Sequence, residues 1–431
     1  MNPLFRNDRR GEHAPSWYAD SADIPPQRPA LKGQETADVC VVGAGFTGLT
    51  AALRLADRGM KVIVLEAHRA GFGASGRNGG QVGSGFNQSQ QWIARKLGDG
   101  PARALWEMAE EAKADLRTLA PPEARFTPGV AHGAYTEAEV DEDKAAAEYL
   151  AETYRYTQIA TLDKTAIQDL IRTKSYVGGV LDMGAGHIHP LRYVLSLAKQ
   201  AESAGATIFE GSDVHHIAQG DPAKVQTGQG HVIARHVILA GNGYLPNIAP
   251  QVNQRVMPIN SFICATEPLG KRAAEILTRD IAVADSKFVV NYFRLSEDKR
   301  LLFGGRESYG IGFPKDISTK LVSRMCTLFP QLKGVPITHV WGGTLGITMS
   351  RLPAVQRITP NVLSAAGFSG HGVALSGFAG KLMAEAVVGQ AERFDVMASL
   401  PTPAFPGGTL ARAPLLTLAM TWYAMRDRLG I

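Results

Sequence analysis

The sequence predicts an α/β protein of two discontinuous domains, one built on a parallel sheet and the other on an antiparallel sheet. The apolar run 38–42 leads through glycines into a helical pattern that stops at Gly59, and the run Val62–Leu65 closes a strand–helix–strand unit. The middle third alternates β-branched, aromatic and polar residues, which favours antiparallel strands. The run Val362–Ala366 then returns the chain to the first sheet.

The remaining elements follow in chain order. Residues 1–35 carry Pro15, Pro25, Pro26 and Pro29, so we expect an extended arm that crosses the surface. Helices are expected over residues 101–119, 136–156, 190–204 and 373–388, and further strands over residues 206–210, 236–240, 256–266, 288–295 and 300–304. The expected boundaries assign residues 36–98, 187–252 and 337–431 to the parallel-sheet domain and residues 99–186 and 253–336 to the substrate domain.

Composition excludes several classes of protein. The 431 residues are 45% hydrophobic and 20% charged with a formal net charge of +5, values typical of a globular protein and too balanced to indicate nucleic-acid binding. The three cysteines are far apart in sequence, which fits a reducing compartment. We find no secretory leader and no integral membrane segment, so we expect a cytoplasmic protein, with the apolar stretch 415–425 packing on the body as a helix.

A glycine motif follows the first predicted strand. Gly43, Gly45 and Gly48 form GxGxxG at the start of a helix, where the backbone can approach a pyrophosphate. Glu66 lies 23 residues after Gly43, at the end of the second strand, and its carboxylate can accept hydrogen bonds from ribose hydroxyls while repelling a 2′-phosphate. The combination predicts FAD or NAD as the ligand.

Two further glycine-rich segments favour a flavin over a nicotinamide. The stretch GFGASGRNGGQ carries many free backbone N–H groups, although a flexible surface loop is the alternative interpretation. The stretch GFSGHG precedes the predicted helix 373–388 and offers a second helix N-terminus, unless it is simply the start of that helix. A ligand with negative charge at both ends fits two such positions, and a flavin is one.

The histidines do not predict a metal site, because none has companion ligands at a suitable spacing. His371 lies between two glycines at the expected flavin edge, where either a catalytic role or a backbone-positioning role is possible. A hydrolase triad has no starting point, since GxSxG is missing.

Four segments together resemble the D-amino acid oxidase family of FAD-dependent amine oxidoreductases. They are VVGAGFTGLTAALRLADRGMKVIVLEA, GASGRNGGQ, HVILAGNGY and GFSGHGVALSGFAGKLMAEA. The resemblance spans nearly the whole chain and implies an FAD-binding Rossmann-like domain of the glutathione reductase type 2 class, with an antiparallel-sheet α+β substrate domain. Within the family, SWYADSA, GASGRNGGQ and WGGTLGITMSRLP are most similar to the members that oxidise γ-glutamylputrescine in polyamine breakdown.

The resemblance also implies where FAD binds. It assigns to the cofactor Gly43, Ala44, Gly45, Phe46, Thr47, Gly48, Glu66, Ala67, Gly73, Ala74, Ser75, Arg77, Asn78, Gly79, Gly80, Gln81, Val214, Ala240, Gly241, Gly367, Phe368, Ser369, Gly370, His371 and Gly372. Several relatives attach FAD through a histidine where this chain has Asn78, or through a cysteine before the C-terminal motif. Neither ligand is evident, so we expect non-covalent FAD.

The expected reaction is oxidation of an amine C–N bond, with hydride transfer to flavin N5 and hydrolysis of the imine. The candidate substrate is γ-glutamylputrescine, a related γ-glutamylated amine or a simple alkylamine, with O2 or another electron acceptor. Catalytic candidates are His371, Trp341 and Tyr244; an aromatic cage would use Tyr244, Tyr292, Phe303 and Trp341, while Arg351 would pair with a substrate carboxylate or form a structural salt bridge. The alternatives are an oxidase or dehydrogenase of secondary or D-amino acids, a non-catalytic flavin-binding or regulatory subunit, and a nicotinamide dehydrogenase.

Overall fold

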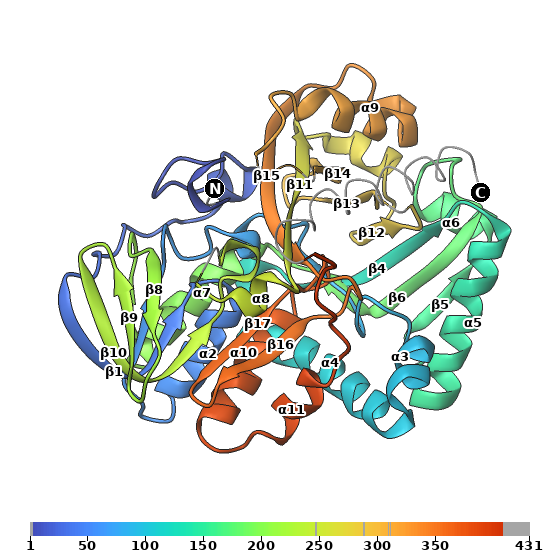
Figure 1. Ribbon diagram of the computed structural model, residues 1–431. Helices are drawn as coiled ribbons and strands as arrows, with labels where there is room; N and C mark the ends of the chain where they lie inside the picture. Colours follow the sequence, from blue (N-terminus) through green and yellow to red (C-terminus); the bar gives the residue numbers. More distant parts are fainter. Residues whose placement is uncertain (1–2, 246–247, 288, 309, 311, 408–431) are drawn as a thin grey trace.

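The protein consists of two large sheets that lie side by side, with helices packed around them (Figure 1). The computed structural model describes residues 3–245, 248–287, 289–308, 310 and 312–407. The helix expected over residues 415–425 lies outside this part of the chain. The predicted α/β class, with one mainly parallel and one mainly antiparallel sheet, is confirmed.

The first sheet is the parallel one. Its main path runs β16 (Ala354–Thr359), β17 (Val362–Ala366), β10 (Gly230–Leu239), β1 (Gly33–Val42), β2 (Val62–Leu65) and β7 (Thr207–Phe209). Strand β9 (Ala223–Thr227) pairs with β10, and β8 (Val214–Ala218) pairs with β9, both antiparallel. Strands β17, β10, β1, β2 and β7 run parallel, so their carboxyl ends meet at one edge of the sheet. That edge is where a parallel sheet binds its ligand.

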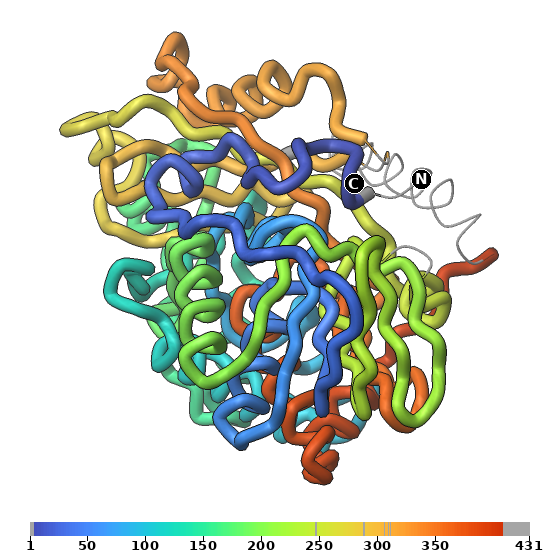
Figure 2. Tube along the Cα trace, turned by 90° about the vertical axis from the view of Figure 1, so that its left-hand side faces the viewer, coloured from blue at the N-terminus to red at the C-terminus, as the bar shows by residue number. Residues whose placement is uncertain are grey.

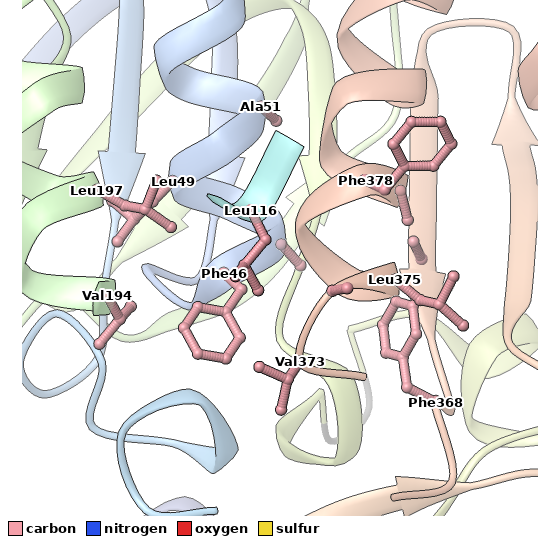
Figure 3. Close-up of a cluster of buried hydrophobic side chains, with 14 of the residues drawn as sticks. Phe46, Leu49, Ala51, Leu116, Val194, Leu197, Phe368, Val373, Leu375 and Phe378 are labelled. Atoms are coloured by element: carbon pink, nitrogen blue, oxygen red, sulfur yellow. The ribbon is translucent and has the colours of Figure 1, made fainter. Parts of the chain in front are cut away.

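Helices cover the first sheet and bury the largest core. They are α2 (Phe46–Ala56), α7 (Pro190–Ser203), α10 (Leu375–Val387) and α4 (Asp99–Leu119). Side chains from all four meet in one cluster, as Leu49, Leu116, Val194 and Phe378 illustrate (Figure 3). The apolar face of the helix predicted over residues 101–119 is buried in this core. The sequence had assigned that segment to the substrate domain instead.

The second sheet is mostly antiparallel. Its main path runs β15 (Ile337–Ile347), β11 (Met257–Thr266), β14 (Leu301–Ser308), β13 (Tyr292–Leu295), β12 (Ala282–Asp285), β4 (Thr127–Ala134), β6 (Gly178–His187) and β3 (Gln81–Val82), and β5 (Ile159–Leu162) pairs with β6. Its helices are α5 (Glu137–Tyr154), α6 (Lys164–Leu170) and α9 (Ser318–Leu328). Strand β15 pairs along its length with β11, so this segment belongs to the second sheet rather than to the parallel-sheet domain to which the sequence assigned it.

Shorter helices complete the described part of the chain. They are α3 (Gln90–Leu97), α8 (Pro250–Asn253) and α11 (Glu392–Ala398), with 3-10 helices at Pro3–Phe5, Ala74–Gly76, Pro122–Ala124, Asn242–Tyr244, Gly270–Glu275 and Pro330–Leu332. None of the helices in the described ranges has the length and apolar character needed to cross a membrane.

The N-terminal arm is not wholly extended, and this corrects the prediction. It contains the short helix α1 (Trp17–Ser21), which begins where Ser16 Oγ accepts a hydrogen bond of 3.2 Å from the Ala19 N–H. The prolines flank this helix instead of interrupting it, and the Tyr18 side chain is fully buried. The arm runs across the side of the molecule over both sheets (Figure 2).

Candidate active site

A cavity of about 460 Å³ lies where the parallel strand ends meet the second sheet. Four parallel strands point at it, because β1, β2, β10 and β17 end immediately before Gly43, Glu66, Ala240 and Gly367. Three of these residues line the cavity; Gly367 lies behind it. The volume lies within the range of ligand-binding sites. The cavity therefore occupies the position that the glycine motifs predicted.

The first glycine motif forms a backbone cradle. Gly43 has φ +108°, and a Cβ there would lie 2.9 Å from the Ala240 carbonyl oxygen. A Cβ on Gly45 would lie 2.8 Å from Ser75 Oγ, which itself accepts a 3.0 Å hydrogen bond from the Phe46 N–H at the start of α2. Bare glycines thus leave the N-terminus of α2 open to a bound phosphate. Gly48 does not line the cavity; it lets α2 pack against the end of β1.

Glu66 is held in a fixed orientation at the end of β2. One carboxylate oxygen accepts a hydrogen bond of 2.8 Å from the Ala44 N–H, and the other accepts one of 2.9 Å from the His68 N–H. Ala44 does not line the cavity, and its N–H serves to orient Glu66. Burial, together with the nearby Glu210 charge, raises the pKa of Glu66 to about 7 against the opposing effect of these N–H donors. The carboxylate can still accept hydrogen bonds from a ligand hydroxyl, because each oxygen has a second lone pair.

The raised pKa of Glu66 predicts a pH-dependent stability of the cofactor-free protein. Because the pKa is higher in the folded chain than its ordinary value of 4.5, the stabilising contribution is fully present below that value. It is lost as pH rises through about 7, by on the order of 3 kcal/mol. Chemical denaturation between pH 4.5 and 8 should therefore show a steeper fall for the wild type than for Glu66→Gln. The exposed control Glu275→Gln should keep the wild-type slope, and equal slopes in Glu66→Gln and wild type would contradict the assignment.

Arg77 lines the cavity and is held by several hydrogen bonds. Its guanidinium is buried and donates to the Phe72 and Gly342 carbonyl oxygens and to Asp8. Its Nη2 is buried and has no hydrogen-bond partner among the described residues. The three bonds made by the other guanidinium nitrogens hold the side chain in place beside the cavity. The glycine cradle and Glu66 together fit a dinucleotide cofactor.

The rest of the second glycine loop shapes the wall of the cavity. Asn78 donates to the Ala74 and Ser75 carbonyl oxygens at 2.9 and 3.1 Å and accepts from the Gly80 N–H at 2.7 Å, so its side chain fixes the loop. Gly80 lies behind the cavity, where a Cβ would meet the Ile188 carbonyl oxygen at 2.1 Å. The other predicted loop residues that line the cavity are Gly73, Ala74, Ser75, Arg77, Asn78, Gly79 and Gln81.

The third glycine segment contributes His371. Residues 368–372 line the cavity. Gly367 does not line it and instead leaves room for Thr348, because a Cβ on residue 367 would lie 2.5 Å from Thr348 Cγ2. The His371 ring packs against Gly83, where a Cβ would lie 2.4 Å from Cε1. Burial, and the nearby Lys113 charge, lower the pKa of His371, so the ring is uncharged at neutral pH.

The four predicted cage aromatics divide into two pairs. Tyr244 and Tyr292 line the cavity; the Tyr244 hydroxyl accepts a 3.1 Å hydrogen bond from the Thr344 N–H, and the Tyr292 hydroxyl lies 3.1 Å from Ser261 Oγ. Phe303 is fully buried in the hydrophobic core of the second sheet. Trp341 is also buried, and its Nε1 donates a hydrogen bond of 3.0 Å to the Arg77 carbonyl oxygen. These two do not line the cavity, and the structure gives them packing roles instead of substrate contact.

The sequence reasoning missed several lining residues. Leu4 comes from the N-terminal arm, and Asn87, Ser261, Thr344 and Glu307 come from the loops and strands of the second sheet. The alternation of residues 256–266 could have found Ser261, because its neighbours Phe262 and Asn260 are buried on the other face. Glu307 lies beyond the predicted strand 300–304, so no signal pointed to it. Arg351 and Val214, both predicted, do line the cavity.

Comparison with known proteins gives a consistent result. Residues 38–386 match the family described as FAD dependent oxidoreductase. The chain is 39% identical over 428 residues to γ-glutamylputrescine oxidoreductase of Escherichia coli strain K12, covering 97% of this chain and 100% of that protein. It is 41% identical over 420 residues to a probable oxidoreductase OrdL of Rhizobium meliloti strain 1021, covering 96% and 97%.

Solved structures show the same fold. The crystal structure of glycine oxidase from Geobacillus kaustophilus superposes with a TM-score of 0.70 at 23% identity, covering 82% of this chain and 95% of that one. L-proline dehydrogenase from P. horikoshii gives a TM-score of 0.66 at 20% identity, covering 84% and 94%. With a family match over most of its length and a cavity that fits a dinucleotide, the chain belongs to the FAD-dependent oxidoreductase family and is an enzyme whose cofactor is FAD.

Proposed function

We propose that this enzyme oxidises the C–N bond of γ-glutamylputrescine or of a closely related γ-glutamylated amine. The observation that carries the proposal is one continuous cavity, lined at one end by Glu66 and the glycine cradle and at the other by Ser261 and Tyr292 of the second sheet. A cofactor and a small organic substrate can therefore meet in one cavity. The identity to the Escherichia coli enzyme supports the choice of amine.

The residues around the cavity divide the work of the reaction. FAD, when bound, supplies the acceptor for two electrons. Tyr244 and Tyr292 offer aromatic faces on which an alkylamine stem can rest, and their position excludes water from that wall. His371, uncharged at neutral pH, brings no positive charge to the cavity wall that it lines. Arg351 lines the same cavity and is placed to pair with a substrate carboxylate.

FAD is proposed to be bound without a covalent link. The Asn78 side chain is engaged in folding its own loop. Cys40 and Cys264 are buried, and none of the three cysteines lines the cavity. Acid denaturation should release all of the flavin into the supernatant. A protein pellet that stays yellow would overturn this part of the proposal.

The test of function is anaerobic reduction of the purified yellow protein by a panel of amines. γ-Glutamylputrescine is expected to bleach the visible flavin absorbance fastest, followed by free putrescine and monoamines. Bleaching by sarcosine, proline or D-alanine, with no response to γ-glutamylated amines, would identify an amino acid oxidase or dehydrogenase instead. Failure of every amine, with a second protein co-purifying, would indicate a non-catalytic flavin-binding subunit. Reoxidation by air, compared with added quinone, then measures whether O2 serves as the acceptor.

A further inference from the structure

The carboxylates that line the cavity lie at two different places. Glu66 follows β2 and Asp213 precedes β8, so both belong to the end of the cavity formed by the first sheet. Glu307 comes from β14 of the second sheet, where the substrate is proposed to bind. Among the described lining residues of the second sheet, it is the one acidic side chain.

Strand pairing explains why Glu307 faces the cavity. In the second sheet Glu307 pairs with Ser261 on β11, and Ser261 pairs in turn with Gly343 on β15. Directly opposed residues of paired strands face the same side of a sheet, and all three line the cavity. Glu307 is therefore part of a row that crosses three strands and reaches Arg77, whose Cδ would lie 2.7 Å from a Cβ on Gly343.

Tyr292 connects this row to the cofactor loop. Its hydroxyl lies 3.1 Å from Ser261 Oγ, and its ring packs on Gly79, where a Cβ would be 2.9 Å from Cδ2. Burial, with a smaller contribution from the Glu307 charge, raises the pKa of Tyr292, so the phenol is uncharged and lies within electrostatic reach of that carboxylate.

The surroundings of Glu307 suit a chain that is apolar in the middle and cationic at one end. Ile259, two residues from Ser261 on β11, and Ala284, which pairs with Tyr292, also line the cavity and offer no hydrogen-bonding side chain. A methylene chain can lie along this wall, and a carboxylate beside apolar surface attracts a cation more strongly than one in bulk water does. A monoamine offers this carboxylate no second ammonium group.

We propose that Glu307 is a specificity-determining residue that binds a second, non-reacting ammonium group of the substrate. This inference rests on the proposed function and deepens it: the preferred substrate carries a cation remote from the amine that is oxidised. The shared chemistry fits both the α-ammonium of a γ-glutamyl group and the distal ammonium of a free diamine.

The experiment compares wild-type holoenzyme with Glu307→Gln and with Glu275→Gln, an exposed charge-neutralising control outside the cavity. Substrates are γ-glutamylputrescine, the same compound with its α-amine acetylated, putrescine and butylamine. The wild type should prefer either γ-glutamylputrescine or putrescine. For the preferred one of these two, Glu307→Gln should raise KM about 10- to 100-fold and change kcat by less than about threefold. KM for butylamine and for the acetylated compound should be nearly unchanged, and Glu307→Asp should recover part of the loss.

Binding without turnover provides an independent readout. γ-Glutamylbutylamide keeps the α-ammonium but lacks the oxidisable amine, and the change it causes in the flavin spectrum reports its Kd. A weaker Kd in Glu307→Gln, at an unchanged FAD content, supports the inference for the γ-glutamyl source; loss confined to putrescine turnover supports the diamine source. An equal loss for butylamine would place Glu307 at the reacting amine and overturn the inference, as would unchanged constants for every substrate, while leaving the proposed function intact. Failure of every amine to reduce wild-type flavin would overturn both.

Discussion

Replacement of Gly48 by alanine is expected to produce a protein that does not retain FAD. A Cβ at this position would lie 1.9 Å from the Gly43 carbonyl oxygen and 3.1 Å from Val41 Cγ1, far inside contact distance. The first obstacle is backbone at the end of β1, which cannot rotate away as a flexible side chain can. The first turn of α2 must therefore move, and with it Gly45, Phe46 and Thr47, which line the cavity.

Two measurements check this expectation. The ratio of flavin to protein absorbance after desalting should fall to near zero, corresponding to at least about a 100-fold loss of affinity. Chemical denaturation of the cofactor-free protein should show a loss of about 1 to 3 kcal/mol from overpacking. Gly100→Ala is the matched control, since Gly100 lies in α4 and a Cβ there would have no neighbouring atom within 4 Å; this variant should keep FAD, with stability changed by less than about 1 kcal/mol. Stoichiometric FAD in Gly48→Ala would show that the close approach is not required.

The parallel sheet could be predicted well because its information is local. Strands Val62–Leu65 and Val362–Ala366 are buried along their whole length, and a short, mainly apolar run marks such a strand. The cofactor cradle was predictable for a related reason: a glycine whose Cβ would collide with backbone, such as Gly43, cannot be replaced without moving the chain.

The errors arose where the outcome depends on distant partners. Helix α1 forms inside a proline-rich arm because Ser16 caps it and Tyr18 finds a buried site against Trp341, with ring centroids 5.4 Å apart. Alternation placed Phe303 on a strand, yet it does not tell which face of a strand meets the cavity and which meets a core. The segment that forms β15 was assigned to the first domain. The assignment failed because β15 pairs with β11, a strand far away in the sequence, and no local pattern reveals that pairing.

Glu210 is the residue whose importance the sequence conceals most. It is 1% exposed and follows the short strand β7. One oxygen accepts from Arg28 Nη1 at 3.0 Å and from the Ala70 N–H at 2.8 Å; the other accepts from the Arg28 N–H at 2.8 Å and from Arg69 Nε at 2.9 Å. These donors lie in the N-terminal arm and in the loop after β2, at least 140 residues away in sequence.

Glu210→Ala should therefore be among the most destabilising single substitutions, at about 3 to 5 kcal/mol, because it leaves two arginines and two backbone donors without their buried acceptor. Glu202→Ala tests the same arginine from the other side. Glu202 also pairs with Arg28, at 2.5 Å, but its side chain is 37% exposed, so its loss should cost no more than about 1 kcal/mol. Urea denaturation of the cofactor-free proteins measures both differences. Since the loop that Glu210 secures begins at Glu66, Glu210→Ala should also weaken FAD binding, whereas Glu202→Ala should not; equal stabilities of the two variants would show that burial of the Arg28 contact makes no difference.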